Sequence, residues 1–205
     1  MTPRRACLLV LLLAAVAAPV AAAPPDDYGP VGPFRLTERD GRTVSAADLD
    51  GKVWVASFVF TRCSGPCPSV TATMARLQGE LKEQPDVRLV TFTVDPERDQ
   101  LSDLNQYADR FGANPQRWLF LTGPKDDVYR LLREGFHVAV DQGKDSEGRP
   151  DINHSTRLVV VDRQGRIRGY YQGMVNAEMP DGARLFEEDL ARLRQRVAAL
   201  VREQP

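Results

Sequence analysis

Apolar segments of strand length recur along the chain and are separated by segments with helical spacing. Val53–Phe60 and Val87–Val94 are nearly continuous apolar runs, which is typical of strands buried on both faces of a sheet. Trp118–Thr122 predicts a third, shorter strand. Between the first two runs, apolar residues recur at steps of three and four, which predicts a helix over residues 68–83 with one buried face.

The rest of the pattern completes a single domain. Helical spacing, short β-rich runs and turn residues predict helices over 101–111, 126–133 and 185–200, a strand over 136–140, a polar excursion over 141–151, and hairpins over 34–45 and 156–171. This order predicts an α/β fold with a central mixed sheet flanked by helices and an N-terminal hairpin extension. We expect the domain to occupy residues 34–205.

The first 33 residues have a different pattern. Arg4 and Arg5 precede an apolar segment, Ala6–Val20, and small residues follow it, which is typical of a secretory signal peptide. We expect residues 1–22 to be this signal, although an uncleaved membrane anchor remains the alternative. Residues 23–33 are rich in Pro, Gly and Asp, so we expect a linker. Both alternatives place the domain outside the cytoplasm, in the periplasm or at the extracytoplasmic face of a membrane, and an anchor would hold it near the bilayer.

Charge gives no case for nucleic acid as a partner. The 205 residues include 27 Lys and Arg against 28 Asp and Glu, a net charge of −1, and they lack the basic excess that phosphate backbones attract. Cysteine is more informative. Of three cysteines, Cys7 lies in the predicted leader, so Cys63 and Cys67 are the only cysteines of the expected domain.

These two cysteines follow the first central strand directly and precede the first predicted helix. A helix N-terminus lowers the pKa of a thiol and favours the thiolate, and thiolates exchange disulfides or bind soft metal ions. The two cysteines could instead form a purely structural disulfide. A disulfide that closes so short a loop would reduce the entropy of the unfolded chain only slightly, so this interpretation is less favoured. A dithiol after the first central strand, in this order of elements, predicts a thioredoxin-like fold.

Several motifs together resemble one family. They are Phe58–Cys63, Cys67–Pro68, Thr93–Asp99, Tyr107 with Phe111, Trp118 with Leu121–Gly123, and Asn153–Ser155. In this order, over residues 30–175, they resemble the Sco (SenC) family of exported or membrane-tethered thioredoxin-fold proteins. The resemblance implies one copper ion per chain, as Cu(I) or Cu(II), bound by Cys63, Cys67 and His154, and a role in maturing the copper site of cytochrome c oxidase. It implies the copper subunit of the oxidase or another copper chaperone as partner, a monomer or weak dimer, and no conventional turnover.

The chemistry of the donors agrees with this implication. Thiolates select Cu(I) and imidazole suits both oxidation states. The resemblance also gives Asp95 a place beside the copper site or in partner docking, whereas its simpler role is to cap the turn that follows. His137, the only other histidine, is expected to be a packed or surface strand residue. Met74 belongs to the apolar helix face, while Met174 and Met179 border a loop.

Two other functions use the same thiols. A thiol-disulfide oxidoreductase would attack with one cysteine and resolve the mixed disulfide with the other. A peroxidase is disfavoured, because Phe60 stands where a peroxidatic cysteine usually has Thr or Ser three positions earlier. Many members of the family have a proline directly after the first cysteine, but here that residue is Ser64 and the proline is Pro66. This departure leaves the spacing of the thiols intact and bears on the balance between copper delivery and redox exchange.

Overall fold

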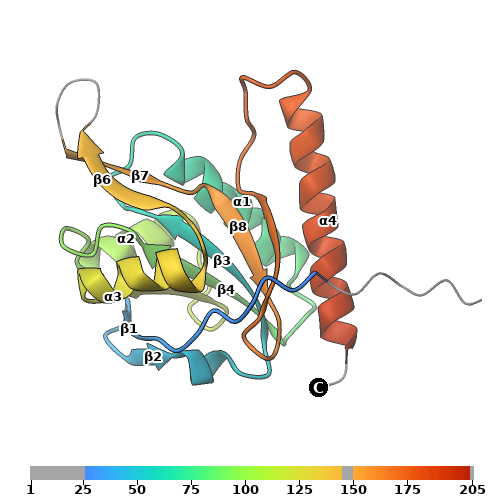
Figure 1. Cartoon of the computed structure of the whole chain (residues 1–205), viewed down its shortest axis with the longest axis horizontal. Coiled ribbons are helices and arrows are strands. Elements are labelled where there is room, and N and C mark those ends of the chain that lie inside the picture. Colours follow the sequence, from blue (N-terminus) through green and yellow to red (C-terminus); the bar gives the residue numbers. More distant parts are fainter. Residues whose placement is uncertain (1–25, 145–149, 204–205) are drawn as a thin grey trace, which may run out of the picture.

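A seven-stranded mixed sheet forms the centre of the domain in the computed structural model, which describes residues 26–144 and 150–203. Its strand order is β2-β1-β5-β4-β3-β8-β9, and β6 and β7 form a separate two-stranded sheet (Figure 1). The strands β3, β4 and β5 are parallel to one another, and the other pairs are antiparallel. The thioredoxin-like mixed α/β architecture expected from the sequence is confirmed. The predicted signal, residues 1–22, lies outside the described residues.

The strands and helices have the following bounds. The strands are β1 Arg35–Glu38, β2 Thr43–Ser45, β3 Val53–Val59, β4 Val87–Thr93, β5 Trp118–Thr122, β6 Val140–Lys144, β7 Pro150–His154, β8 Arg157–Val161 and β9 Ile167–Gln172. The helices are α1 Cys67–Glu80, α2 Leu101–Arg110, α3 Lys125–Arg130 and α4 Gly182–Arg202, with a 3-10 turn at Ala46–Leu49 and a π-helical turn at Leu131–Gly135.

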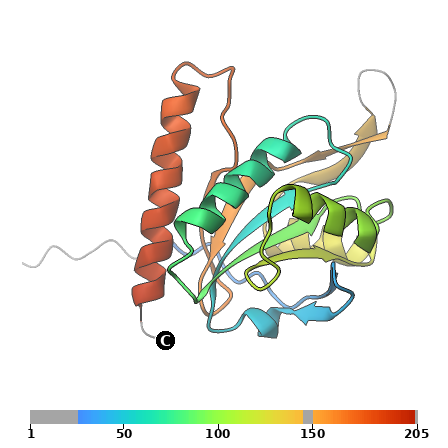
Figure 2. The same cartoon turned by 180° about the vertical axis from the view of Figure 1, so that it is seen from behind.

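The helices cover both faces of the sheet. Because parallel neighbours are joined by right-handed crossovers, α1 and α2 lie on the same face (Figure 2). The long helix α4 lies beside α1, and the two are joined by ion pairs from Arg76 to Glu187 at 2.6 Å and from Arg194 to Glu80 at 3.0 Å. Helix α3 and the β6–β7 hairpin lie on the opposite face (Figure 1).

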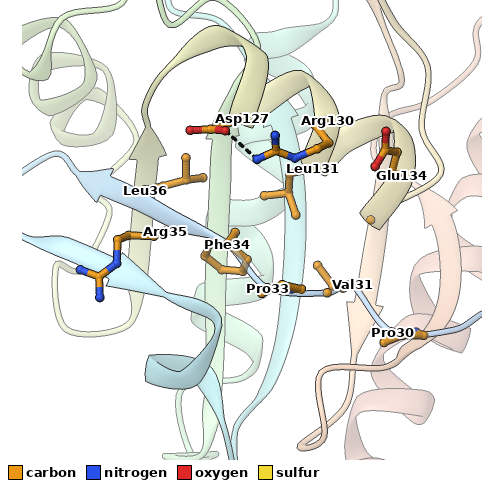
Figure 3. A pocket seen from close by; sticks show the side chains of 12 residues that line it. Pro30, Val31, Pro33, Phe34, Arg35, Leu36, Asp127, Arg130, Leu131 and Glu134 are labelled. Carbon is orange, nitrogen blue, oxygen red and sulfur yellow. Dashed lines mark hydrogen bonds and ion pairs between the residues drawn. The ribbon is translucent and has the colours of Figure 1, made fainter.

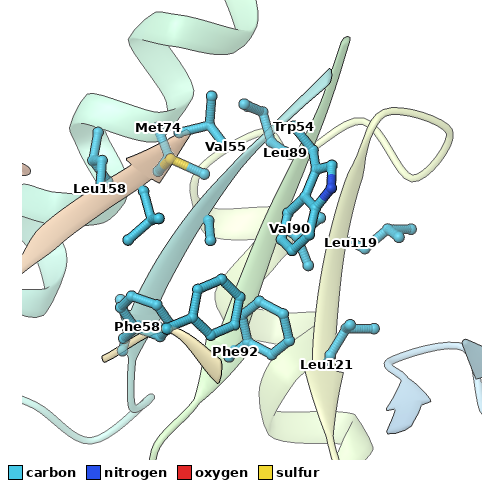
Figure 4. Close-up of a cluster of buried hydrophobic side chains, with 14 of the residues drawn as sticks. Trp54, Val55, Phe58, Met74, Leu89, Val90, Phe92, Leu119, Leu121 and Leu158 are labelled. Atoms are coloured by element: carbon cyan, nitrogen blue, oxygen red, sulfur yellow. The ribbon is translucent and has the colours of Figure 1, made fainter. Parts of the chain in front are cut away.

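Strand β3 is the centre of the hydrophobic core, and all seven of its residues are buried. On one face, the ring of Phe58 stacks on Phe92 at 6.0 Å and meets Phe136 edge-on at 5.1 Å. On the other face, Met74 of α1 is fully buried beside the sheet (Figure 4). The expected burial of this strand on both faces, and of Met74 in the core, is therefore confirmed, and the strand that leads to the dithiol is rigidly embedded.

One predicted element is wrong. In place of the strand expected over residues 136–140, a bend and an irregular connection over residues 136–139 follow the helical turn that ends at Gly135, and β6 begins only at Val140. Helix α3 runs into the π-helical turn, where Gly135 fits tightly because a Cβ there would lie 2.5 Å from the carbonyl oxygen of Val31. His137 then adopts a left-handed backbone conformation with φ 53°. The polar excursion expected over residues 141–151 contributes strand residues at both of its ends.

The packed part of the chain begins earlier than the expected boundary at Phe34. Tyr28 N–H donates to Ile167 O at 3.0 Å, Ile167 N–H donates to Gly29 O at 2.9 Å, and Pro30 bridges to Arg166. Val31 is buried. Residues 28–31, expected to be linker, therefore run along the start of β9. Within the described ranges, no helix has the length and apolar character needed to cross a membrane.

Candidate functional site

The two cysteines lie where the central strand passes into the first helix. Strand β3 ends at Val59, residues 60–66 form the connection that we call the dithiol turn, and Cys67 is the first residue of α1. Cys63 is half-buried in the turn and packs against the core, whereas Cys67 is fully buried. Both thiols are free. The expected placement of Cys63 in the loop and Cys67 in the first helical turn is what the structure contains.

The two thiols are electrostatically unequal. A hydrogen bond from the Cys67 thiol, together with one from His154, lowers the pKa of Cys63 to about 4 against the opposing effect of burial. The interaction with Cys63, followed by burial, raises the pKa of Cys67 well above its usual range. The pair thus shares one proton. Cys63, the more exposed sulfur, is the thiolate, and a thiolate is both the nucleophile and the metal ligand.

His154 reaches the dithiol from a distant part of the sequence. It is the last residue of β7 and pairs with Val140 of β6. Its Nε2 lies 3.3 Å from Sγ of Cys67, and its Nδ1 lies 3.0 Å from the carbonyl oxygen of Ser155. The imidazole also meets the ring of Phe60 edge-on at 5.8 Å. Since a carbonyl only accepts, Nδ1 carries a proton in this arrangement, and Nε2 is the nitrogen that faces the sulfur of Cys67.

The predicted ligands therefore lie near one another, but their side chains are not arranged around a common point where a metal ion could bind all three. Across residues 26–144 and 150–203, no group of three or more His, Cys, Asp and Glu side chains is arranged so that it could hold a metal ion as placed. A metal bound by both sulfurs and the imidazole at once would require a shift of the dithiol turn or of the β6–β7 hairpin. The donor set itself, two sulfurs and one nitrogen, is one that suits a soft metal.

Asp95 occupies a buried position on the neighbouring connection, two residues beyond β4. It is 2% exposed, and burial raises the pKa of its carboxyl group against the attraction of Arg98. Nε of Arg98 lies 2.6 Å from Oδ2 of Asp95, an ion pair without hydrogen-bond geometry. The backbone N–H of Asp95 donates to the hydroxyl of Thr93 at 3.0 Å. No contact joins Asp95 to either sulfur or to His154 in the described network, so its expected place near the site stays a prediction.

The sequence did not reveal the residues that hold the dithiol turn in place. The carboxylate of Asp99 accepts hydrogen bonds from the backbone N–H and the hydroxyl of Thr61 and from the hydroxyl of Thr93. At the other end of the turn, the hydroxyl of Thr71 donates to the carbonyl oxygen of Cys67 at 2.8 Å and contacts Tyr107 Oη at 2.8 Å. Asp99 belongs to one of the motifs noted in the sequence, but its partner Thr61 is 38 residues away. No periodic pattern of residues connects two positions so far apart, so the sequence does not predict this contact.

Comparison with known proteins decides which family this arrangement represents. The sequence matches SCO1/SenC over residues 23–180. The chain belongs to the SCO1/SenC family. A "SCO1 protein homolog" of Bacillus subtilis (strain 168) is 35% identical over 153 residues, which cover 74% of this chain and 78% of the relative. The match to the mitochondrial SCO2 homolog of Mus musculus, at 30% identity, spans 72% of this chain and 58% of that relative's length.

Solved structures of the SCO1/SenC family share the fold. BsSco, described as a member of the Sco family of cytochrome c oxidase assembly proteins with a disulfide switch, is 30% identical, with a TM-score of 0.70 over 88% of this chain and 97% of its own. ScoI of Arabidopsis thaliana, solved with copper bound, is 25% identical, with a TM-score of 0.63 over 80% of this chain and 98% of its own. The resemblance inferred from the motifs is therefore confirmed.

Both histidines of this SCO1/SenC chain line one cavity of about 610 Å³, together with Tyr28, Asn153 and Tyr170. His137 is exposed there and not in a strand, so its expected strand position is wrong, and of the two expected settings, packed or surface, it has the surface one. A larger cavity of about 700 Å³ lies between residues 30–36 and α3 with its following turn (Figure 3). None of the cysteines, histidines or Asp95 lines it. Of the candidate ligands, His154 lines the smaller of these two cavities and none lines the larger.

Proposed function

We propose that this chain binds one copper ion through Cys63, Cys67 and His154 and carries it as cargo during maturation of the copper site of cytochrome c oxidase. One observation carries the proposal: the imidazole Nε2 of His154 lies 3.3 Å from Sγ of Cys67, although 87 residues separate them. The half-buried thiol of Cys63 and the buried thiol of Cys67 are both free and lie beside an oriented imidazole. This set of two sulfurs and one nitrogen suits a soft metal ion.

Each donor is prepared for a metal in a different way. The lowered pKa of Cys63 supplies a thiolate at neutral pH, and the proton of Cys67 would leave when a metal replaces it. The hydrogen bond from Nδ1 of His154 to Ser155 O fixes the tautomer that offers Nε2. Thiolate sulfur selects copper as Cu(I), and imidazole suits both Cu(I) and Cu(II). Three protein ligands leave room for an incoming ligand from a partner, which is what transfer of a cargo ion requires.

The relatives indicate the setting of this function. BsSco is described as a cytochrome c oxidase assembly protein and Arabidopsis ScoI was solved with copper bound. With the leader-like pattern of residues 1–22, they support a protein that works outside the cytoplasm, and we expect it to be a monomer or weak dimer. Its copper would pass to the copper subunit of the oxidase or come from another copper chaperone.

The test is metal binding by the reduced protein, with the second histidine as matched control. We expect one equivalent of Cu(I), measured by competition with a chromophoric chelator of known affinity. His154→Ala should weaken binding by well over tenfold, because it removes one of three donors. His137→Ala changes the other histidine of the same cavity and should leave affinity within about twofold. Equal affinity of the wild type and His154→Ala would refute the ligand set.

A second candidate function rests on the inequality of the two thiols. Cys63 is half-buried with a lowered pKa and Cys67 is buried with a raised one, which is the arrangement of an attacking and a resolving thiol. The Cys63 thiolate would attack a disulfide of a partner and release one partner thiolate. Cys67 would then attack the mixed disulfide, release the second partner thiolate and form the Cys63–Cys67 disulfide. Reduction of oxidised oxidase-subunit peptide by wild type and by His154→Ala at equal rates, with weak copper binding in both, would favour this function.

A further inference from the structure

The carboxylate of Asp99 is a buried junction between the dithiol turn and the connection from β4 to α2. Asp99 is 2% exposed, and its two oxygens accept three donors. Thr61 gives its backbone N–H at 3.1 Å and its hydroxyl at 2.6 Å, and Thr93 gives its hydroxyl at 2.5 Å. A buried carboxylate with this many matched donors is a strong structural tie, because breaking any one leaves a polar group unpaired away from water.

The tie lies very close to the reactive sulfur. Thr61 is two residues before Cys63, and the backbone N–H of Cys63 donates to the carbonyl oxygen of Phe60 at 3.3 Å. Fixing Thr61 therefore fixes the start of the tight turn that carries Cys63. The exposed Arg62 adds a second link from the same turn to the same connection, since its Nη2 donates to the carbonyl oxygen of Arg98 at 3.0 Å.

The far end of the dithiol turn is held by the helix that Asp99 precedes. Tyr107 of α2 is 2% exposed and contacts the hydroxyl of Thr71, which in turn donates to the carbonyl oxygen of Cys67. The connection and α2 thus hold both ends of the segment between the two sulfurs. Cys67 is already fixed by the helix α1 that it begins, so the Asp99 contacts govern mainly the freedom of Cys63.

We propose that Asp99 is a positioning residue that holds Cys63 in the open dithiol arrangement and so sets the reduction potential of the pair and its affinity for copper. Closing the disulfide brings the two sulfurs to about 2.05 Å with a restricted dihedral angle. Cys67 cannot follow without unwinding the start of α1, so Cys63 must move. The contacts of Asp99 with Thr61 oppose that movement and favour the reduced form that a metal requires.

The redox equilibrium that reports this effect involves two electrons. Glutathione disulfide accepts them and becomes two molecules of glutathione, while the Cys63 thiolate and the Cys67 thiol lose two electrons and one proton and form one S–S bond; one glutathione takes that proton and the other takes one from water. The equilibrium constant is measured directly by quenching mixtures with acid and separating the two forms. It does not depend on copper, so it tests the positioning role even if the proposed copper function fails. The copper-affinity arm alone rests on the proposed function.

Three variants isolate the role of Asp99. Asp99→Asn keeps the shape but replaces one acceptor oxygen by an amide donor that faces the donors of Thr61 or Thr93. Thr61→Val removes the hydroxyl donor with little change of volume, and Thr61→Ser retains it. We expect Asp99→Asn and Thr61→Val each to shift the equilibrium about tenfold toward the disulfide, equivalent to about 30 mV, and to weaken Cu(I) binding about tenfold. Thr61→Ser should restore both within about threefold.

A buried hydrogen bond elsewhere provides the control for a general loss of stability. The hydroxyl of Ser57 lies 2.8 Å from that of Thr91 between β3 and β4, away from the turn. Ser57→Ala should lower the melting temperature and leave the redox equilibrium unchanged. Unchanged equilibria in both Asp99→Asn and Thr61→Val, or an equal shift in Ser57→Ala, would overturn the proposal. If Asp99→Asn does not fold, the comparison of Thr61→Val with Thr61→Ser decides alone.

Discussion

The sulfur side and the nitrogen side of the candidate site are built differently. The dithiol turn extends directly from β3, which is buried along its whole length in the seven-stranded sheet, and is held by buried hydrogen bonds. His154 lies on the separate two-stranded sheet of β6 and β7. Among the residues of this hairpin whose side chains the structure describes, Val140 and Ile152 are the ones buried in the core. The sulfurs are therefore positioned by the fold as a whole, and the imidazole by a peripheral element.

For the copper-carrying function that we propose, the difference would allow the ion to be both held and released. A rigid element gives affinity, because little entropy is lost when its ligands bind, while a peripheral element opens at lower free-energy cost than the whole domain. Movement of the β6–β7 hairpin would withdraw His154 and leave the two sulfurs with the metal. Variants that perturb one side at a time test this asymmetry.

Truncation of a core side chain should affect the sulfur side through the whole fold. Phe58→Ala removes a fully buried ring that contacts Phe92 and Phe136, and we expect it to lower the free energy of unfolding by about 3–5 kcal/mol. Urea denaturation followed by tryptophan fluorescence measures it. A loss below about 1 kcal/mol would contradict the view that the dithiol rests on a tightly packed centre.

Removal of the buried thiol should change the pH dependence of the exposed one. In the wild type, the pKa of Cys63 near 4 means that Cys63 is a thiolate from pH 5 upward, so its alkylation rate by iodoacetamide is flat from pH 6 to 8. Cys67→Ala removes the hydrogen bond that lowers this pKa. The pKa of Cys63 should rise, and the rate at pH 6 should fall at least tenfold relative to pH 8.

Mass spectrometry of the alkylated peptide gives these rates. His137→Ala, which leaves the thiol pair intact, should retain the flat profile. A flat profile in Cys67→Ala as well would show that the helix N-terminus or His154 alone sets the pKa of Cys63.

Loosening the hairpin should affect the nitrogen side alone. Ile152→Ala removes most of a side chain that is 4% exposed and should cost about 2–3 kcal/mol. We expect hydrogen exchange to accelerate in β6 and β7, Cu(I) affinity to fall about tenfold, and the redox equilibrium of the dithiol to stay within about twofold. Equal acceleration of exchange in β3 and β4 would show that the two sides open as one unit.

The smallest effect should come from the surface contact that joins the two sides. Nζ of Lys125 donates to Glu97 at 2.8 Å, on the connection next to the dithiol turn, and to Gln142 of β6 at 2.9 Å. Glu97 is exposed and Lys125 is partly exposed, so salt screens their attraction. Lys125→Ala should change copper affinity by less than about twofold, measured by the same chelator competition at low and high salt. A tenfold change at low salt would mean that this bridge couples the hairpin to the dithiol.

The sequence allowed the sulfur side to be predicted better than the nitrogen side, for a physical reason. The apolar run at Val53–Phe60 and the helical spacing after Cys67 are local signals of burial, so the strand, the turn and the helix follow from them. The alternation of Phe136, Val138 and Val140 imitates a strand, but the tight contact of Gly135 with Val31 and the left-handed backbone at His137 replace it with a turn. Such contacts between distant segments leave no periodic trace.

Within the site, the sequence likewise points to the candidate metal ligands but not to the residues that hold them in place. Cys63, Cys67 and His154 were predicted as donors from the resemblance of their motifs to a family, and their side chains are chemically distinctive. Asp99 and Tyr107 act through hydrogen bonds to threonines on other elements, and threonine is too common a residue to identify a partner. The predicted place of Asp95 depends on a resemblance and is still to be tested.

The pairing of residues 28–31 with the first residue of β9 has a consequence for colloidal behaviour. β9 is an outer strand of the sheet, and Ile167 uses both of its backbone groups on Tyr28 and Gly29. A chain shortened to begin at Phe34 would present these groups at an open strand edge, where another copy could add a strand. We expect such a truncated domain to self-associate and precipitate at concentrations at which the longer chain stays dispersed.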